Sequence, residues 1–457
     1  MLPCFFTREV KAAVPIRLLL QSEYPAWLTK QSAFVKQWLS SNQFLSEPGN
    51  ISLIPGDSGK LSSVICCISD MNNIWAVGNL PTVLPCGTYF FDIPRDYYSR
   101  FASVWGLGAY QFSRYKKFLK KPAQLYLPKE LHPEKINNIV ESIYWVRDLI
   151  NTPTDDMGPS ELAIAASELR QLFSAKIKHI VGEELIKQNF PAIYAVGRAS
   201  DDAPRLIDIR WGNKKHPKVT LVGKGVCFDT GGLDIKPSSA MLLMKKDMGG
   251  AAHVLGLARM IMQAKLPICL RILIPAVENS ISGNAYRPGD VINSRKGLTI
   301  EIGNTDAEGR VILADALTEA VSEQPDLLID IATLTGAARV ALGTDLPALF
   351  TNQETLARDI SQHAHREQDP VWHMPLFTAY RDSLNSIIAD INNNSTDGYG
   401  GAITAALFLK EFVPDNIPWV HFDLMAWNLK PRPGRPQGGE AMGLRGLLSY
   451  LSARFGK

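Results

Sequence analysis

The sequence lacks the features that mark membrane-spanning, secreted or nucleic-acid-binding proteins. No apolar run reaches the roughly 18 uncharged residues that a membrane-spanning helix needs. The segment 1–27 places Arg8, Glu9, Lys11 and Arg17 among its apolar side chains, which is a poor match to a secretory signal. The formal net charge is only +3 and no long basic run occurs, so we expect neither a membrane nor a nucleic-acid partner.

CxxC cysteine pairs are also missing. The six cysteines form no CxxC motif and have no regular spacing, which predicts a reduced, cytoplasmic protein with buried thiols. Cys227 has no histidine near it in sequence, so we interpret it as a small buried apolar residue and not as a nucleophile. The chain has 457 residues, of which 46% are hydrophobic and 20% charged, as expected for a globular protein of two domains.

The N-terminal part contains short apolar runs separated by turn residues. We predict strands at 61–70 and 73–80 and a smaller N-terminal α/β domain over residues 1–125. Apolar residues then recur at helical spacing up to Ile150, and Pro153 ends the pattern. We therefore expect a linker helix at 126–150 and a larger C-terminal catalytic domain at 151–457.

In the C-terminal part, strand and helix patterns alternate. The expected strands are 219–222, 269–279 and 327–334, and the expected helices are 249–264 and 309–324. Such alternation predicts an α/β fold with a central, largely parallel or mixed sheet flanked by helices. Ligands bind such sheets at the carboxyl ends of the strands.

Three polar loops follow these predicted elements. They carry Lys224, Asp229, Lys236, Asp247, Asp306, Glu308 and Arg310. Taken singly, each aspartate is more often a helix cap than a ligand, and each lysine or arginine is more often a surface or ion-pairing group. If the strands are neighbours, however, the four carboxylates converge, and they need a compensating cation to stay ionised together.

Divalent metal is the usual compensating cation, because carboxylates are hard oxygen ligands that can bridge two ions. Only His253 lies within the three loops, six residues after Asp247. His363 and His365 are two residues apart and would face different sides of a helix. A histidine-rich zinc site is therefore not expected.

Two long segments carry a family resemblance. The segment 222–253, VGKGVCFDTGGLDIKPSSAMLLMKKDMGGAAH, and the segment 275–317, which contains NTDAEGR at 304–310, resemble the two signature blocks of the leucyl aminopeptidase family, peptidase family M17. The segment 331–343, IATLTGAARVALG, is also similar to that family. The resemblance is dense from Arg147 to Asn428 and weak over residues 1–125. It implies a metal-dependent aminopeptidase that removes the N-terminal residue of peptides and aminoacyl amides.

The resemblance implies roles for the loop residues. One metal ion would be held by Lys224, Asp229, Asp247 and Glu308, and a second by Asp229, Glu308 and both the side chain and carbonyl oxygen of Asp306. The ions would be Zn²⁺ and/or Mn²⁺. Lys224 must then be a neutral amine, so the metal must lower its pKa. Lys236 would stabilise the oxyanion, and Arg310, with Gly309 and Leu334, would hold a bicarbonate ion that acts as general base.

The resemblance also implies a pocket for the first side chain of the substrate, at Met244, Thr333, Gly336, Met425 and Asn428. The family usually has alanine at the position of Met425 and methionine at that of Asn428. We expect leucine and methionine to remain acceptable first residues, with polar residues gaining relative to leucine. By the same resemblance, we expect a homohexamer.

There are three alternatives to an active aminopeptidase, and the sequence argues against two of them. A DNA-binding regulator on the same scaffold is the chief alternative, because some bacterial members of the family bind DNA. An inactive relative kept as a scaffold would not need all seven motif residues, which are present. A dinuclear phosphatase would not be expected to carry a lysine-containing NTDAEGR site.

Overall fold

The protein is described by a computed structural model over residues 1–8, 13–56, 58–118, 120–395 and 397–456. The chain forms two compact units, one from residues 1–144 and 430–437 and the other from 145–429 and 438–457. The division falls within helix α5 (Pro133–Asn151), which lies where apolar periodicity predicts a helix. None of the helices in these described ranges is both long and apolar enough to cross a bilayer.

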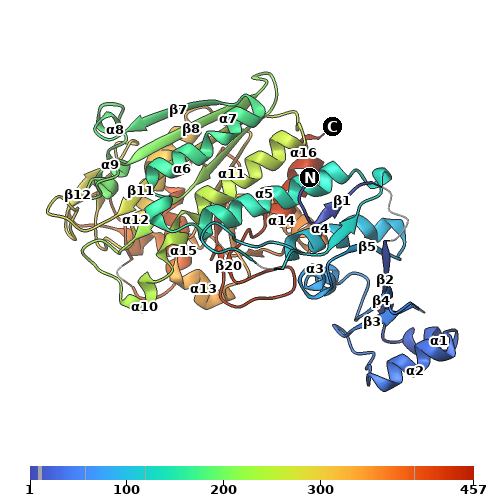
Figure 1. Ribbon diagram of the computed structural model, residues 1–457. Helices are drawn as coiled ribbons and strands as arrows, with labels where there is room; N and C mark the ends of the chain where they lie inside the picture. The colour runs from blue at the N-terminus through green and yellow to red at the C-terminus, as the bar shows by residue number, and fades with distance from the viewer. Residues whose placement is uncertain (9–12, 57, 119, 396, 457) are drawn as a thin grey trace. The chain divides into compact units, whose positions relative to one another are not determined.

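The first unit contains a six-stranded sheet in the order β1-β6-β5-β2-β4-β3 (Figure 1). All neighbouring strands are parallel except β3 and β4. The strands are β1 (Phe5–Phe6), β2 (Val14–Leu20), β3 (Ile51–Pro55), β4 (Leu61–Ile68), β5 (Thr88–Phe91) and β6 (Gln124–Tyr126). Its helices are α1 (Tyr24–Thr29), α2 (Ala33–Ser41), α3 (Leu80–Val83) and α4 (Arg95–Gly108). The predicted strand at 61–70 is thus present as β4.

The predicted strand at 73–80 is wrong. This segment forms a 3₁₀ turn, η1 (Ile74–Val77), and Leu80 begins α3, whose first turn contains Pro81. Ile74 and Val77 are buried at the three-residue spacing that a 3₁₀ turn places on one side. At Gly78 a Cβ would stand 2.2 Å from the amide nitrogen of Gly434, so the segment 430–437 packs directly against the turn. A short apolar run cannot by itself distinguish these conformations.

The second unit is built on a nine-stranded mixed sheet. The order is β16-β15-β18-β14-β9-β11-β8-β7, and β10 also pairs with β11. The strands are β7 (Lys176–Val181), β8 (Arg205–Gly212), β9 (Lys218–Gly223), β10 (Gly225–Asp229), β11 (Cys269–Asn279), β14 (Leu327–Ala332), β15 (Ala348–Thr351), β16 (Trp372–His373) and β18 (Trp419–Asp423). The four central strands β18, β14, β9 and β11 are parallel. The predicted α/β class with a central mixed sheet is confirmed.

Every residue of β14 is buried, as is typical of a central strand in a sheet that helices cover on both faces. Helices α11 (Gly249–Gln263) and α12 (Glu308–Val321) each pack against β9, β11 and β14 (Figure 1). The other helices are α6 (Pro159–Ala166), α7 (Glu168–Phe173), α8 (Glu184–Lys187), α9 (Pro191–Gly197), α10 (Ser238–Met241), α13 (Gly336–Leu342), α14 (Glu354–Arg366), α15 (Gly401–Lys410) and α16 (Leu444–Phe455). Buried side chains of α9, α12 and α15 share one hydrophobic cluster with Val222 and Leu328 of the central strands.

Short strands and a 3₁₀ turn complete the second unit. β12 (Val291–Asn293), β13 (Thr299–Glu301) and β17 (Ile391–Asn392) form one small sheet, and β19 (Trp427–Asn428) pairs with β20 (Gly438–Gly439). The turn η4 (Met244–Met248) immediately precedes α11. The predicted metal-binding and catalytic residues lie in the segment after β9, at and after the end of β10, in η4, and at the start of α12 or just before it, whereas Met425 follows β18 and Asn428 lies in β19.

Candidate metal centre

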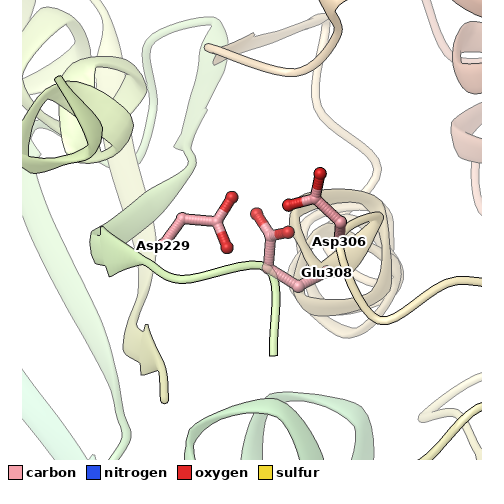
Figure 2. A group of neighbouring side chains, drawn as sticks. All are labelled: Asp229, Asp306 and Glu308. Atoms are coloured by element: carbon pink, nitrogen blue, oxygen red, sulfur yellow. The ribbon is translucent and has the colours of Figure 1, made fainter. Parts of the chain in front are cut away.

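Three carboxylates from two distant segments of the chain meet beyond the ends of the central strands. Asp229 ends β10, Glu308 begins α12, and Asp306 lies in the turn just before it. Ligand oxygens of the three residues lie within 4.8 Å of one another. Figure 2 shows the three side chains pointing toward a common space. The predicted convergence of these residues is therefore present in the fold.

Lys224 and Asp247 lie beside Glu308. The Lys224 ammonium is 2.8 Å from Asp247 Oδ2 and 2.8 Å from Glu308 Oε1, and all three side chains are buried. At Gly309 a Cβ would stand 2.7 Å from Lys224 Nζ. Only glycine at position 309 leaves room for the lysine, which explains the small residue after Glu308 in the motif.

Lys236 lies on the other side of the cluster. Its ammonium is 2.8 Å from Asp229 Oδ2 and also forms an ion pair with Asp306. Burial by itself would lower the pKa of Lys236, but the charges of Asp229 and Glu308 more than offset it and raise the pKa. Lys236 therefore carries a full positive charge next to the carboxylates.

The carboxylates are too crowded to ionise normally. Burial, reinforced by the charge of Asp229, raises the pKa of Glu308 to about 8 and that of Asp306 to about 6. Glu308 Oε2 is buried and accepts no hydrogen bond from any residue that the structure describes. A buried carboxylate oxygen without a donor is costly, and a divalent cation among hard oxygen ligands removes that cost. The residues present therefore fit a divalent metal.

A second layer of hydrogen bonds holds the carboxylates in place. Asp229 Oδ1 accepts from Asn279 Nδ2 at 2.8 Å and from the amide of Gly231 at 2.9 Å. Thr333 Oγ1 donates to Asp247 Oδ1 at 2.7 Å. Such outer hydrogen bonds fix the orientation of metal ligands. Sequence reasoning missed Asn279, although its place at the carboxyl end of β11 was a usable signal.

Arg310 is buried on α12 beyond the carboxylates. Its Nη1 donates to the carbonyl of Asn393 at 2.8 Å, and its Nε has no partner within the described ranges. Burial lowers the pKa of Arg310 to about 10 against the opposing charge of Glu308, so the guanidinium stays protonated at neutral pH. The amide of Leu334 donates to Asp423 Oδ1 at 2.9 Å. The predicted bicarbonate contacts of Arg310, Gly309 and Leu334 stay predictions, and the Leu334 amide is engaged with Asp423 in this structure.

The predicted pocket residues differ in their surroundings. Met244, Thr333 and Met425 are buried, and Gly336 is exposed at the start of α13. Asn428 is buried too, but its Nδ2 donates to Glu440 Oε2 at 2.6 Å. One hydrogen of the Asn428 amide is therefore used by an internal carboxylate.

Glu440 belongs to a buried ion pair that the sequence gave no sign of. Arg147 Nε and Nη2 donate to its two carboxylate oxygens at 3.0 and 3.1 Å. The amide of Ala441 also donates to Glu440 Oε1. The two-point geometry and the added donors satisfy the buried charges.

His253 is a structural residue. Its Nδ1 lies 2.6 Å from the carbonyl of Gly249, and its Nε2 accepts the amide hydrogen of Met442 at 2.9 Å. These contacts require a neutral ring with its hydrogen on Nδ1. Burial lowers the pKa of His253 to about 4, which agrees with the neutral form. His253 is thus not a candidate ligand.

Comparisons with known proteins agree with this geometry. Residues 144–448 match the model of the cytosol aminopeptidase family, catalytic domain, and residues 14–128 match that of the M17 aminopeptidase, N-terminal domain. A probable cytosol aminopeptidase of Prochlorococcus marinus is 36% identical over 427 residues, covering 89% of this chain and 85% of the relative.

Solved structures are similar over almost the whole chain. The crystal structure of the cytosol aminopeptidase from Coxiella burnetii has a TM-score of 0.97 and 53% identity, and 99% of each chain is covered. The bottromycin maturation enzyme BotP in complex with Mn has a TM-score of 0.88 and 31% identity, covering 97% of this chain and 99% of BotP. The chain belongs to the cytosol aminopeptidase family, whose members are metal-dependent enzymes that hydrolyse the N-terminal bond of peptides.

Proposed function

We propose that the protein is a two-metal aminopeptidase acting on peptides and aminoacyl amides. One ion would be held by Lys224, Asp229, Asp247 and Glu308, and the other by Asp229, Asp306 and Glu308, including the carbonyl oxygen of Asp306. The observation that carries the proposal is the grouping of Asp229, Asp306 and Glu308 within 4.8 Å, with Glu308 Oε2 lacking a donor among the described residues. When bound, Zn²⁺ or Mn²⁺ supplies Lewis acidity and lowers the pKa of water.

The residues around the metals have separate tasks. If Asp229 and Asp306 held metal, the Lys236 ammonium would be free of its ion pairs with them and could donate to the oxyanion derived from the scissile carbonyl. The unpartnered Nε of Arg310 fits a bound anion, and we propose bicarbonate there as the general base. The described residues of the site include no free histidine or carboxylate that would otherwise take this proton.

We further propose that the first side chain of the substrate lies against Met244, Thr333, Gly336 and Met425, and that apolar residues such as leucine and methionine are accepted there. The buried Met244 and Met425 favour apolar contact. We also propose a homohexamer acting in the cytoplasm. Light scattering at micromolar concentration tests the assembly, and a monomer would contradict it.

The test of the function is metal removal and addition. Thoroughly chelated protein should not hydrolyse a panel of aminoacyl amides, and Zn²⁺, Mn²⁺ or Co²⁺ should restore the activity. Asp229→Ala and Glu308→Ala should each lose bound metal as well as rate, because each side chain would contact both ions. Full activity in protein shown to be metal-free would refute the two-metal mechanism.

A further inference from the structure

Two positive side chains near the metal centre have no carboxylate partner among the residues that the structure describes. Lys246 in η4 is 1% exposed, and within the described residues its ammonium makes no hydrogen bond and no ion pair. Arg339 in α13 also forms no ion pair in the described ranges, and its Nη1 is buried without a hydrogen-bond acceptor. Buried charges are normally paired, so two unpaired cations require an explanation.

Both cations lie beside the proposed pocket for the first side chain. Arg339 Nη2 is 3.7 Å from the point where a Cβ of Gly336 would stand. Lys246 is two residues after Met244, and the charge of Arg339 acts directly on its ammonium. Gly249, at the end of the same turn, approaches Thr333 so closely that a Cβ would be 3.0 Å from its methyl group. Arg339 therefore lies beside Gly336, and Lys246 belongs to the same short turn as Met244, so each cation adjoins a residue proposed for the pocket.

The nearby acids are already engaged. Asp247 and Asp423 are the carboxylates that act electrostatically on Lys246. In neither case is a carboxylate oxygen within 4.0 Å of the Lys246 ammonium nitrogen, the distance that defines an ion pair. Asp247 accepts from Thr333 and faces Lys224. Asp423 accepts from the amides of Leu334 and Thr335 and from the Thr335 hydroxyl. As a proposed metal ligand, Asp247 would be still less available to Lys246.

We propose that Lys246 and Arg339 select an acidic side chain, glutamate or aspartate, at the first residue of the substrate. The proposal rests on the proposed aminopeptidase function and defines its substrate class. Met244 and Met425 contact the methylene stem, and the carboxylate completes the missing ion pairs of the two cations. A planar guanidinium and an ammonium together match the oxygens of one carboxylate. Leucine remains a substrate, since its side chain uses the same apolar walls.

The first test uses the unmodified holoenzyme, so it does not depend on any variant folding. Glutamyl, glutaminyl and leucyl p-nitroanilides are compared by kcat/KM. Glutamate and glutamine have the same shape, so the ratio isolates the charge. We expect glutamyl substrate to exceed glutaminyl substrate by about tenfold or more, the usual effect of a hydrogen bond to a charged group. A ratio at or below one overturns the proposal.

The second test removes each charge. Lys246→Met and Arg339→Met should each bring the glutamyl-to-glutaminyl ratio toward one while the leucyl substrate is still hydrolysed. Lys245→Met is the matched control, because the Lys245 ammonium donates to the carbonyl of Asn151 and stands over the Trp427 ring. The control should keep the parent's ratio. An unchanged ratio in both Lys246→Met and Arg339→Met refutes the assignment.

Two further arms separate this inference from its alternatives. If the metal-loaded parent hydrolyses no aminoacyl substrate, the proposed function itself fails. If it hydrolyses leucyl substrate but shows no charge preference, only the acidic subsite fails. A carboxylate could also come from the free C-terminus of a dipeptide, so leucinamide is compared with leucylglycine. If Lys246→Met weakens only leucylglycine, the cations bind the substrate's C-terminus and the proposal is overturned.

Discussion

Metal binding should release protons, because the metal-free site stores them. The Lys224 ammonium lies 2.8 Å from a carboxylate oxygen of Asp247 and 2.8 Å from one of Glu308. Burial by itself would lower the pKa of Lys224, but the charges of these carboxylates outweigh burial and raise the pKa. A lysine ligates metal only as a neutral amine, so its proton must leave. Glu308, with a pKa of about 8, is also mostly protonated at neutral pH and must ionise to bridge two ions.

The expected release at pH 7 is about two protons per subunit, one from Lys224 and most of one from Glu308. It should fall to about one at pH 9, where Glu308 is already ionised. Apparent affinity should accordingly rise with pH, by about a hundredfold per unit near neutrality. Above the Glu308 pKa the slope should flatten to about tenfold.

Titration calorimetry of metal-free protein with Mn²⁺, in two buffers of different ionisation enthalpy, measures the released protons directly. Lys224→Met has a side chain of similar length without the ammonium, and should release about one proton fewer. Release of less than about half a proton at pH 7, or equal release from the variant, would show that Lys224 does not become a ligand.

Three further predictions concern catalysis and stability. Lys236→Ala should lose about 10²–10³-fold in kcat with metal content unchanged, because Lys236 acts on charge that develops in the transition state. Steady-state kinetics and metal analysis measure both quantities, and a near-normal kcat would show that Lys236 is only structural. Glu440→Ala should lower the free energy of unfolding by about 3–5 kcal/mol because it removes the carboxylate from a buried ion pair with Arg147, and the double change with Arg147→Met should recover part of this in denaturant titrations. His253 stays neutral when folded, with a pKa of about 4, but is protonated below about pH 6.5 when unfolded. Stability should therefore fall between pH 6.5 and 4 by up to about 1.4 kcal/mol per unit, and His253→Gln should flatten this slope in urea titrations at several pH values; parallel slopes for parent and variant would contradict it.

Local sequence was sufficient for the elements near the site. The helices α11 and α12 and the strands β9, β11 and β14 lie where the apolar pattern predicted them, because each is a largely buried segment that reads in the sequence as a run rich in apolar residues. The segment 73–80 was mispredicted because its conformation depends on Gly78 packing against residues 430–437, which local sequence does not reveal.

The acidic motif could also be assembled from sequence, since parallel strands bring their carboxyl ends to one edge and four carboxylates need a cation. What the sequence could not supply was the partner of each polar group. Asn428 looked like a pocket donor, but the fold gives its amide to Glu440. Lys245 and Lys246 are neighbours in sequence, yet the fold buries Lys246 without a counter-ion in its described parts and places the Lys245 ammonium on the Asn151 carbonyl.

The sequence by itself determined the fold class, through the apolar patterns of its helices and strands, and it supplied three acidic loops whose residues resemble those of a known family. Only the tertiary structure decided which charges are neutralised and which remain for a ligand. Hydrogen bonds and ion pairs act over a few ångströms between residues that can be hundreds of positions apart, as Arg147 and Glu440 are, and their energies depend on burial that exists only after the chain has folded.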